Sequence, residues 1–168
     1  MKRIALLLEN LYDDQELVYP YIRMQEEGFR VDLIGPEKAT VYKSKHGLPM
    51  KSDFSSRDIS ADDYDAVIIP GGFSPDYMRR SEATIAFVKA MDEQKKPIAA
   101  ICHGPWVMVS ACDLRSKNLT GFFSIRDDIE NAGATYHDRE VVVDGHLITS
   151  RTPRDLPAFV KAIIGQLA

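Results

Sequence analysis

Short apolar runs alternate with amphipathic stretches along most of the chain. Continuous apolar runs are typical of strands buried on both faces, whereas apolar residues spaced three and four apart are typical of helices. We predict strands over residues 3–8, 29–34, 65–70 and 97–101. We predict helices over residues 13–27, 82–94, 103–111 and 153–167. Parallel strands joined by right-handed helical crossovers form a sheet covered on both faces. The pattern therefore predicts one α/β domain over residues 1–168, a doubly wound, mostly parallel, flavodoxin-like sheet flanked by helices.

The C-terminal third of the chain adds a β-hairpin to this scheme. Val141–Val143 and Leu147–Ser150 are apolar segments on either side of Asp144-Gly145, which is a strong signal for a tight turn. Because His146 directly follows this turn, we predict that it lies on the surface. Two further short edge strands are expected at residues 41–43 and 48–50.

The composition is that of an ordinary globular protein and excludes a mainly disordered chain. Of the 168 residues, 45% are hydrophobic and 27% are charged. A net charge of −4 argues against a nucleic-acid partner, because nucleic-acid-binding proteins usually carry a basic patch. The apolar run at 4–8 is too short for a signal peptide and no stretch is long enough to span a membrane. We therefore expect a cytoplasmic protein without a membrane partner.

Cys102 lies in a strand–turn–helix context that is typical of catalytic nucleophiles. It follows the apolar strand 97–101, and the small residues Ala100 and Gly104 flank it as in a nucleophile elbow. A thiol at a helix N-terminus is expected to have a lowered pKa, because the helix dipole favours the thiolate. Cys112, the other cysteine, lacks this context, and we interpret it as a packing residue that forms no disulfide with Cys102.

Ligands of such sheets bind outside the carboxyl ends of the strands, where two further loops meet Cys102. His103 is a candidate general base or acid, or else contributes only its backbone N–H to an oxyanion site. Gly71 and Gly72 follow a central strand without a phosphate-binding pattern, so an oxyanion-lining loop suits them better. Asp76 is a candidate to orient His103, although starting a helix would also explain it.

The loop after the first strand is acidic, and most of its carboxylates are expected to be solvated. Glu16 lies one turn into the following helix and is the best candidate to reach the sulfur. A carboxyl group beside a thiolate must be protonated to help it, and it then donates a hydrogen bond. The four histidines show no spacing typical of metal ligands, so neither a metal nor another cofactor is expected.

Several motifs together resemble the PfpI-type intracellular protease and stress-protein family, within the class I glutamine amidotransferase-like superfamily. The most specific are AICHGP at 100–105 and PGGFSPDYMR at 70–79. Similar segments follow at DDQELVYPYIRMQEEG (13–28), KHG (45–47), DDIENAGA (127–134), EVVVDG (140–145) and TSRTPRDLPAF (149–159).

The resemblance implies roles for individual residues. Cys102 matches the nucleophile, Glu16 the buried acid that hydrogen-bonds the thiol, Gly72 the backbone group on the oxyanion side and His103 the neighbouring histidine. Asp76 matches the position from which a neighbouring subunit completes the triad. The family assembles as dimers, and some members as hexamers, so a homo-oligomer is expected.

One departure from the family concerns the segment at residues 120–124. The archaeal proteases carry a tyrosine there, and this chain has Phe122 at the matching place. The missing hydroxyl removes a hydrogen bond, which weakens the expectation of peptidase activity but leaves thiol chemistry on small carbonyls untouched.

Three functions follow as alternatives. The leading hypothesis is a cysteine-dependent stress-response enzyme that acts on reactive carbonyls or glycated adducts, as a deglycase or glutathione-independent glyoxalase. The second is an intracellular cysteine peptidase that acts on peptides. The third is a non-enzymatic redox-sensing or holdase stress protein, whose accessible thiol is oxidised.

Overall fold

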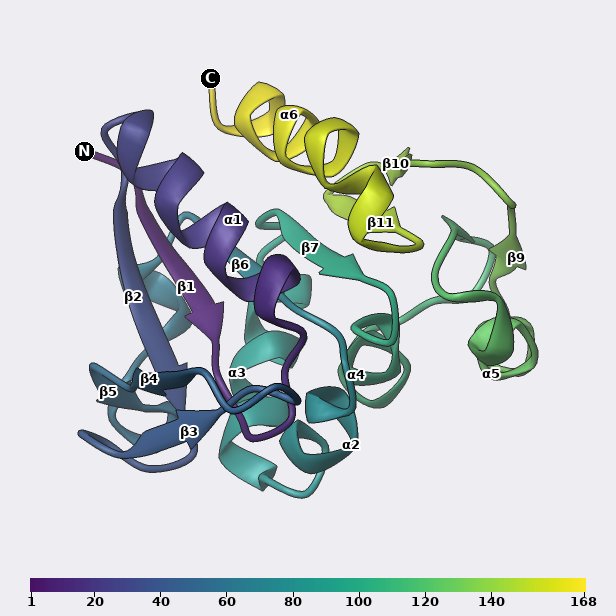
Figure 1. Cartoon of the computed structure of the whole chain (residues 1–168). Helices are drawn as coiled ribbons and strands as arrows, with labels where there is room; N and C mark the ends of the chain where they lie inside the picture. Colours follow the sequence, from purple (N-terminus) through teal and green to yellow (C-terminus); the bar gives the residue numbers. More distant parts are fainter.

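The computed structural model describes residues 1–168 and contains a seven-stranded central sheet in the order β10-β11-β7-β6-β1-β2-β5 (Figure 1). All neighbouring strands are parallel except β10 and β11, which form the antiparallel hairpin. The predicted doubly wound sheet with an added hairpin is therefore confirmed. The strands are β1 (Arg3–Leu7), β2 (Arg30–Gly35), β5 (Phe54–Ser55), β6 (Ala66–Ile69), β7 (Ile98–Ile101), β10 (Val142–Asp144) and β11 (Leu147–Ser150).

Helices cover both faces of the sheet, which divides the apolar core into two clusters. In Figure 1, α1 and α6 lie side by side on the face toward the viewer, while α3 lies behind the strands. Alternate residues of β1 point to opposite sides: Ile4 and Leu6 pack with α1 and α6, and Ala5 and Leu7 pack with α3 and α4. Burial on both faces explains why the strands read as continuous apolar runs. The helices are α1 (Asp14–Glu26), α3 (Glu82–Glu93), α4 (Pro105–Ala111) and α6 (Leu156–Leu167).

The predicted short strands are present, but they do not extend the main sheet. They pair with each other as an antiparallel ribbon, and β5 forms the sheet edge instead. The ribbon bonds to the loop after β1, where the Leu11 N–H donates to the Lys43 carbonyl over 2.8 Å. It thereby fixes the loop that leads into α1. The remaining elements are β3 (Val41–Lys43), β4 (Pro49–Lys51), α2 (Ser74–Met78), β8 (Asn118–Leu119), α5 (Arg126–Asn131), β9 (Thr135–Tyr136), and 3-10 turns η1 (Ser56–Asp58), η2 (Ala61–Asp63), η3 (Phe123–Ile125) and η4 (Pro153–Asp155).

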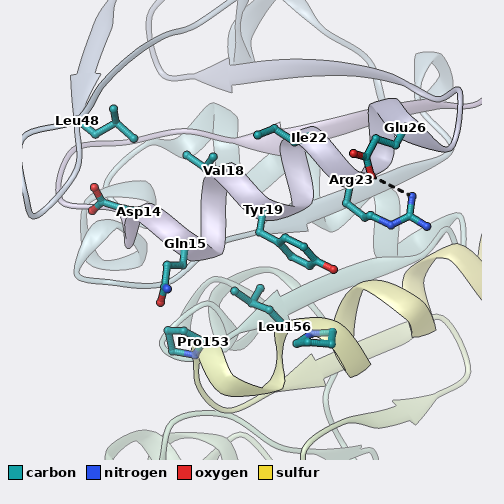
Figure 2. A pocket seen from close by; sticks show the side chains of 11 residues that line it. Asp14, Gln15, Val18, Tyr19, Ile22, Arg23, Glu26, Leu48, Pro153 and Leu156 are labelled. Carbon is teal, nitrogen blue, oxygen red and sulfur yellow. Dashed lines mark ion pairs between the residues drawn. The ribbon is translucent and has the colours of Figure 1, made fainter.

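An open groove of about 720 Å³ runs between α1 and the start of α6 (Figure 2). Tyr19 of α1 points toward Leu156 across it, whereas Val18 and Ile22 lie on the side of Leu48. The carboxyl ends of β6 and β7, where the candidate nucleophile lies, do not contribute to its lining. No helix in the structure is both long enough and apolar enough to cross a membrane.

His146 is buried, and the prediction that it lies on the surface is wrong. Its Nε2 lies 2.6 Å from Asp92 Oδ1 at the end of α3, and both side chains are more than nine-tenths buried. The other Asp92 oxygen accepts a 3.0 Å hydrogen bond from the Asp113 N–H. Asp92 therefore joins the hairpin, α3 and the loop after α4, and the paired carboxylate explains why a polar ring is tolerated inside.

We predict that Asp92→Ala lowers the free energy of unfolding by about 3 kcal/mol, because it leaves the buried His146 ring and the Asp113 N–H without their acceptor. Urea denaturation measures the change. The matched control is Asp62→Ala, which removes an exposed carboxylate that accepts a hydrogen bond from Gln94. We expect the control to cost less than about 0.5 kcal/mol. Equal losses in the two variants would contradict a special role for the buried pair.

Candidate active site

Cys102 occupies a sharp turn between β7 and α4. Its φ of +61° lies in the left-handed region, which non-glycine residues rarely adopt. Backbone hydrogen bonds hold this conformation on each side. The Cys102 N–H donates to the Ser150 carbonyl over 3.0 Å, and the Phe122 N–H donates to the Cys102 carbonyl over 2.8 Å. Strain that the surroundings maintain in this way is typical of functional turns.

Glu16 is brought to the sulfur by the first turn of α1. The Asp13 carboxylate caps this helix by accepting from the Glu16 N–H over 3.2 Å, and Lys45 Nζ lies 2.6 Å from the other Asp13 oxygen. Asp13 is therefore buried rather than solvated. The Glu16 side chain is fully buried, and its carboxyl group lies beside Cys102, since both flank Gly71.

The close approach of Glu16 and Cys102 depends on Gly71. The Gly71 N–H donates to Glu16 Oε2 over 2.7 Å. A Cβ at this position would lie 2.5 Å from that oxygen and 2.8 Å from the Cys102 Cβ, so no side chain fits there. The other carboxyl oxygen, Oε1, is buried without a hydrogen-bond partner. A proton on Oε1 would thus remain available for donation to a bound substrate.

Burial sets the protonation of this pair. It raises the pKa of Glu16 to about 8, with a further contribution from the charge of Asp13. Burial also raises the pKa of the Cys102 thiol, and the Glu16 charge adds to the effect, while backbone N–H groups of His103 and Gly72 oppose it. The expectation that the helix dipole lowers the thiol pKa is therefore wrong, because desolvation outweighs the dipole. At neutral pH the Glu16 carboxyl group keeps its proton.

The two ring nitrogens of His103 face the Cys102 sulfur and the Ser124 hydroxyl. Nδ1 lies 3.4 Å from the Cys102 sulfur, and Nε2 lies 3.3 Å from Ser124 Oγ. Burial, together with the nearby charge of Lys45, lowers the pKa of the imidazole. The ring is therefore placed as a neutral proton acceptor, and the backbone N–H of the same residue also faces the sulfur. The geometry allows both predicted roles of His103, as a general base or acid and as a backbone N–H donor to an oxyanion.

The structure does not bring Asp76 to His103 within the chain. The Asp76 carboxylate lies in α2 and pairs with Arg80 over 2.6 Å. The partner of the imidazole is instead Ser124, which the sequence reasoning missed. Only the position of Ser124 at the end of the segment 120–124, where the family tyrosine is matched, pointed to it. Of the predicted site residues, the chain thus gathers Glu16, Gly71, Gly72, Cys102 and His103.

Aromatic rings pack around the His103 side chain. The His103 ring lies between Trp106 and Phe122, with ring centroids 5.0 Å and 4.9 Å away. Phe122 in turn contacts the exposed Phe123, and Trp106 contacts Phe73. The five rings form a continuous series of contacts, with His103 in the middle.

Comparison with known proteins places the chain in a family. Residues 2–166 match the DJ-1/PfpI family. The chain belongs to the DJ-1/PfpI family. The resemblance drawn from the sequence motifs is thereby confirmed, and the match extends over nearly all of the structure.

Relatives within the DJ-1/PfpI family carry more than one kind of name. YraA of Bacillus subtilis, named as a candidate cysteine protease, is 46% identical over 158 residues, which cover 94% of each chain. The deglycase PfpI of Pyrococcus furiosus is 40% identical over 162 residues, which cover 96% of this chain and 97% of PfpI. These names show that relatives of this chain are described as enzymes of different kinds.

A solved structure shows the same fold within a larger protein. A two-domain protein of Anabaena variabilis, with DJ-1/ThiJ/PfpI-like and ferritin-like domains, superposes with a TM-score of 0.96 at 44% identity. The match covers 99% of this chain and 48% of that protein, so this chain spans about half the length of its structural relative.

We predict that the contribution of Glu16 to the free energy of unfolding falls as the pH rises from about 4.5 to about 8, because only the unfolded state readily ionises Glu16 in this range. The Glu16→Gln variant has no such proton to lose. Its free energy of unfolding relative to the native protein therefore rises by several kcal/mol between pH 4 and pH 9. Urea denaturation across this range measures the difference. Parallel curves for the two proteins would contradict the raised pKa.

Proposed function

We propose that this DJ-1/PfpI protein is a cysteine-dependent stress-response enzyme that acts on reactive carbonyls, as a glutathione-independent glyoxalase or deglycase. The observation that carries the proposal is the buried Glu16 carboxyl group, which still holds a proton at neutral pH beside the Cys102 thiol. Together with the neutral His103 ring, it supplies one proton donor and one acceptor at a single sulfur. The deglycase name of the Pyrococcus furiosus relative supports the same assignment.

The first step is addition of the thiol to the aldehyde of an oxoaldehyde such as methylglyoxal. His103 Nδ1 takes the thiol proton as the sulfur attacks the aldehyde carbon. A C–S bond forms, the π electrons of the carbonyl move to oxygen, and that oxygen receives the proton from His103. The product is a hemithioacetal. The backbone N–H groups of Gly72 and His103, which face the sulfur, stabilise the developing oxyanion.

The second step moves hydrogen between the two carbons. His103 removes the proton from the carbon attached to sulfur while Glu16 protonates the neighbouring ketone oxygen, which gives an enediol. The proton on His103 then passes to the second carbon, and the hydroxyl on the first carbon returns its proton to Glu16. The resulting thioester is attacked by water, the C–S bond breaks and the thiol is restored. One methylglyoxal and one water thus give one lactate.

A cysteine peptidase is the second candidate, and the name of the Bacillus subtilis relative favours it. The same thiol and histidine would perform acyl transfer. That chemistry benefits from a carboxylate on the imidazole, whereas within one copy of the chain Ser124 holds this place and Asp76 pairs with Arg80. Redox sensing through oxidation of the Cys102 thiol is the third.

We also propose that copies of the chain associate as a homodimer or hexamer. In that arrangement Asp76 of one copy, which is partly exposed, reaches the site of its neighbour. Tyr19 and Ile22 on the outer face of α1 supply exposed apolar surface for association. A cytoplasmic location stays a prediction.

We predict that the native protein forms lactate from methylglyoxal without glutathione and that Cys102→Ala abolishes this activity, because no other group forms the hemithioacetal. The matched control is Cys112→Ala, which removes the other free thiol and retains activity. An enzymatic lactate assay measures the rates. If the native protein, verified as reduced, forms no lactate, carbonyl chemistry is excluded, and hydrolysis of a peptide substrate becomes the next assay.

A further inference from the structure

A second pocket lies at the carboxyl edge of the sheet, next to the nucleophile rather than in the α1–α6 groove. It has a volume of about 820 Å³, and Phe122 and Phe123 line it together with the segment that follows β11. That segment starts beside Cys102, because Ser150 at the end of β11 pairs with Ile101 at the end of β7. One wall of the pocket is thus Phe122, whose ring contacts the imidazole of His103. We call it the Phe123 pocket.

The apolar lining of the Phe123 pocket consists of aromatic rings. Phe123 is 73% exposed although its ring centroid lies only 4.6 Å from that of Phe122. Tyr136 also lines the pocket, and its hydroxyl donates to the Gly121 carbonyl over 2.9 Å, which fixes the ring. Packing within the chain does not explain so exposed a phenylalanine beside a catalytic residue. Its free face is suited to a planar ring, since aromatic pairs gain energy beyond their buried area.

 One of the two arginines that line the Phe123 pocket has no ion-pair partner. The Arg151 guanidinium already has two ion-pair partners, because it pairs with Asp155 over 2.9 Å and with Asp138 over 2.9 Å. Arg154 lines the same pocket, is exposed, and has no acidic side chain within salt-bridge distance in the chain. An unpaired guanidinium is a fork of donors that matches a carboxylate.

We propose that the Phe123 pocket is the subsite for the substituent of the carbonyl substrate, and that it selects an aromatic ring bearing a carboxylate. The inference rests on the proposed function, because it places the reacting aldehyde at Cys102. The ring of the substituent stacks on Phe123, and its carboxylate pairs with Arg154. Methylglyoxal, with a methyl group as its substituent, uses neither contact.

Steady-state kinetics test the proposal with three oxoaldehydes: methylglyoxal, phenylglyoxal and 4-carboxyphenylglyoxal. Phe123→Ala lowers the kcat/KM ratio of phenylglyoxal to methylglyoxal by about fivefold, the value of one aromatic contact. Arg154→Gln lowers the ratio of 4-carboxyphenylglyoxal to phenylglyoxal by about tenfold, the value of a charge-assisted hydrogen bond. Methylglyoxal turnover stays unchanged in the two variants. The control is Val143→Ala, which shortens an exposed apolar side chain on β10.

Calorimetric binding separates this proposal from the proposed function. The probes are 4-acetylbenzoate and acetophenone, ketones that differ only in the carboxylate. We expect the native protein to bind 4-acetylbenzoate about tenfold more tightly, and Arg154→Gln to remove the difference. Equal binding of the two ketones, or a difference that survives in Arg154→Gln, would overturn the subsite. Absence of methylglyoxal turnover would overturn the carbonyl chemistry instead, and leave the calorimetric result to decide whether the pocket recognises aromatic carboxylates.

Discussion

The contact between the buried Glu16 carboxyl group and the Cys102 thiol is the constraint on which the rest of the site depends. Two negative charges cannot share this enclosed space, so the pair retains a proton at neutral pH. The surrounding chain is shaped by the same contact. Gly71 has no side chain because the carboxyl oxygen and the Cys102 Cβ fill the space, and Asp13 caps α1 so that Glu16 faces inward. The strained turn at Cys102 then completes the approach from the opposite side.

The parts of the fold that could be predicted are those with a local physical cause. Strands buried on both faces must be apolar throughout, so β1, β6 and β7 were evident as runs, and the Asp144-Gly145 turn marked the hairpin. The place of Cys102 followed in the same way, since the small residues around it are required by a sharp strand-to-helix turn. Glu16 was identified because one helical turn separates it from the loop at the carboxyl edge.

The parts that could not be predicted depend on residues far apart in the sequence. His146 and Asp92 are separated by 54 positions, and Ser124 and His103 by 21, so no local pattern connects either pair. The prediction of a lowered thiol pKa was wrong for a related reason. The helix N-terminus is visible in the sequence, but the burial that raises the pKa of Cys102 is produced by the whole fold. Asp76 is different. Its spacing of four from Arg80, which follows the end of α2, was a local signal for the ion pair that the structure contains.

The partner of His103 separates the chemistries that this fold can support. A carboxylate on the imidazole stabilises the imidazolium that forms during acyl transfer. Within one copy of the chain, the Ser124 hydroxyl offers Nε2 no such charge, and burial already disfavours the protonated ring. An imidazole of this kind accepts a proton only briefly and returns it readily. Glu16, with a pKa of about 8, releases and recovers a proton in the same range. A protonated carboxyl group and a neutral imidazole around one sulfur favour movement of hydrogen between adjacent carbons over the formation of a lasting ion pair.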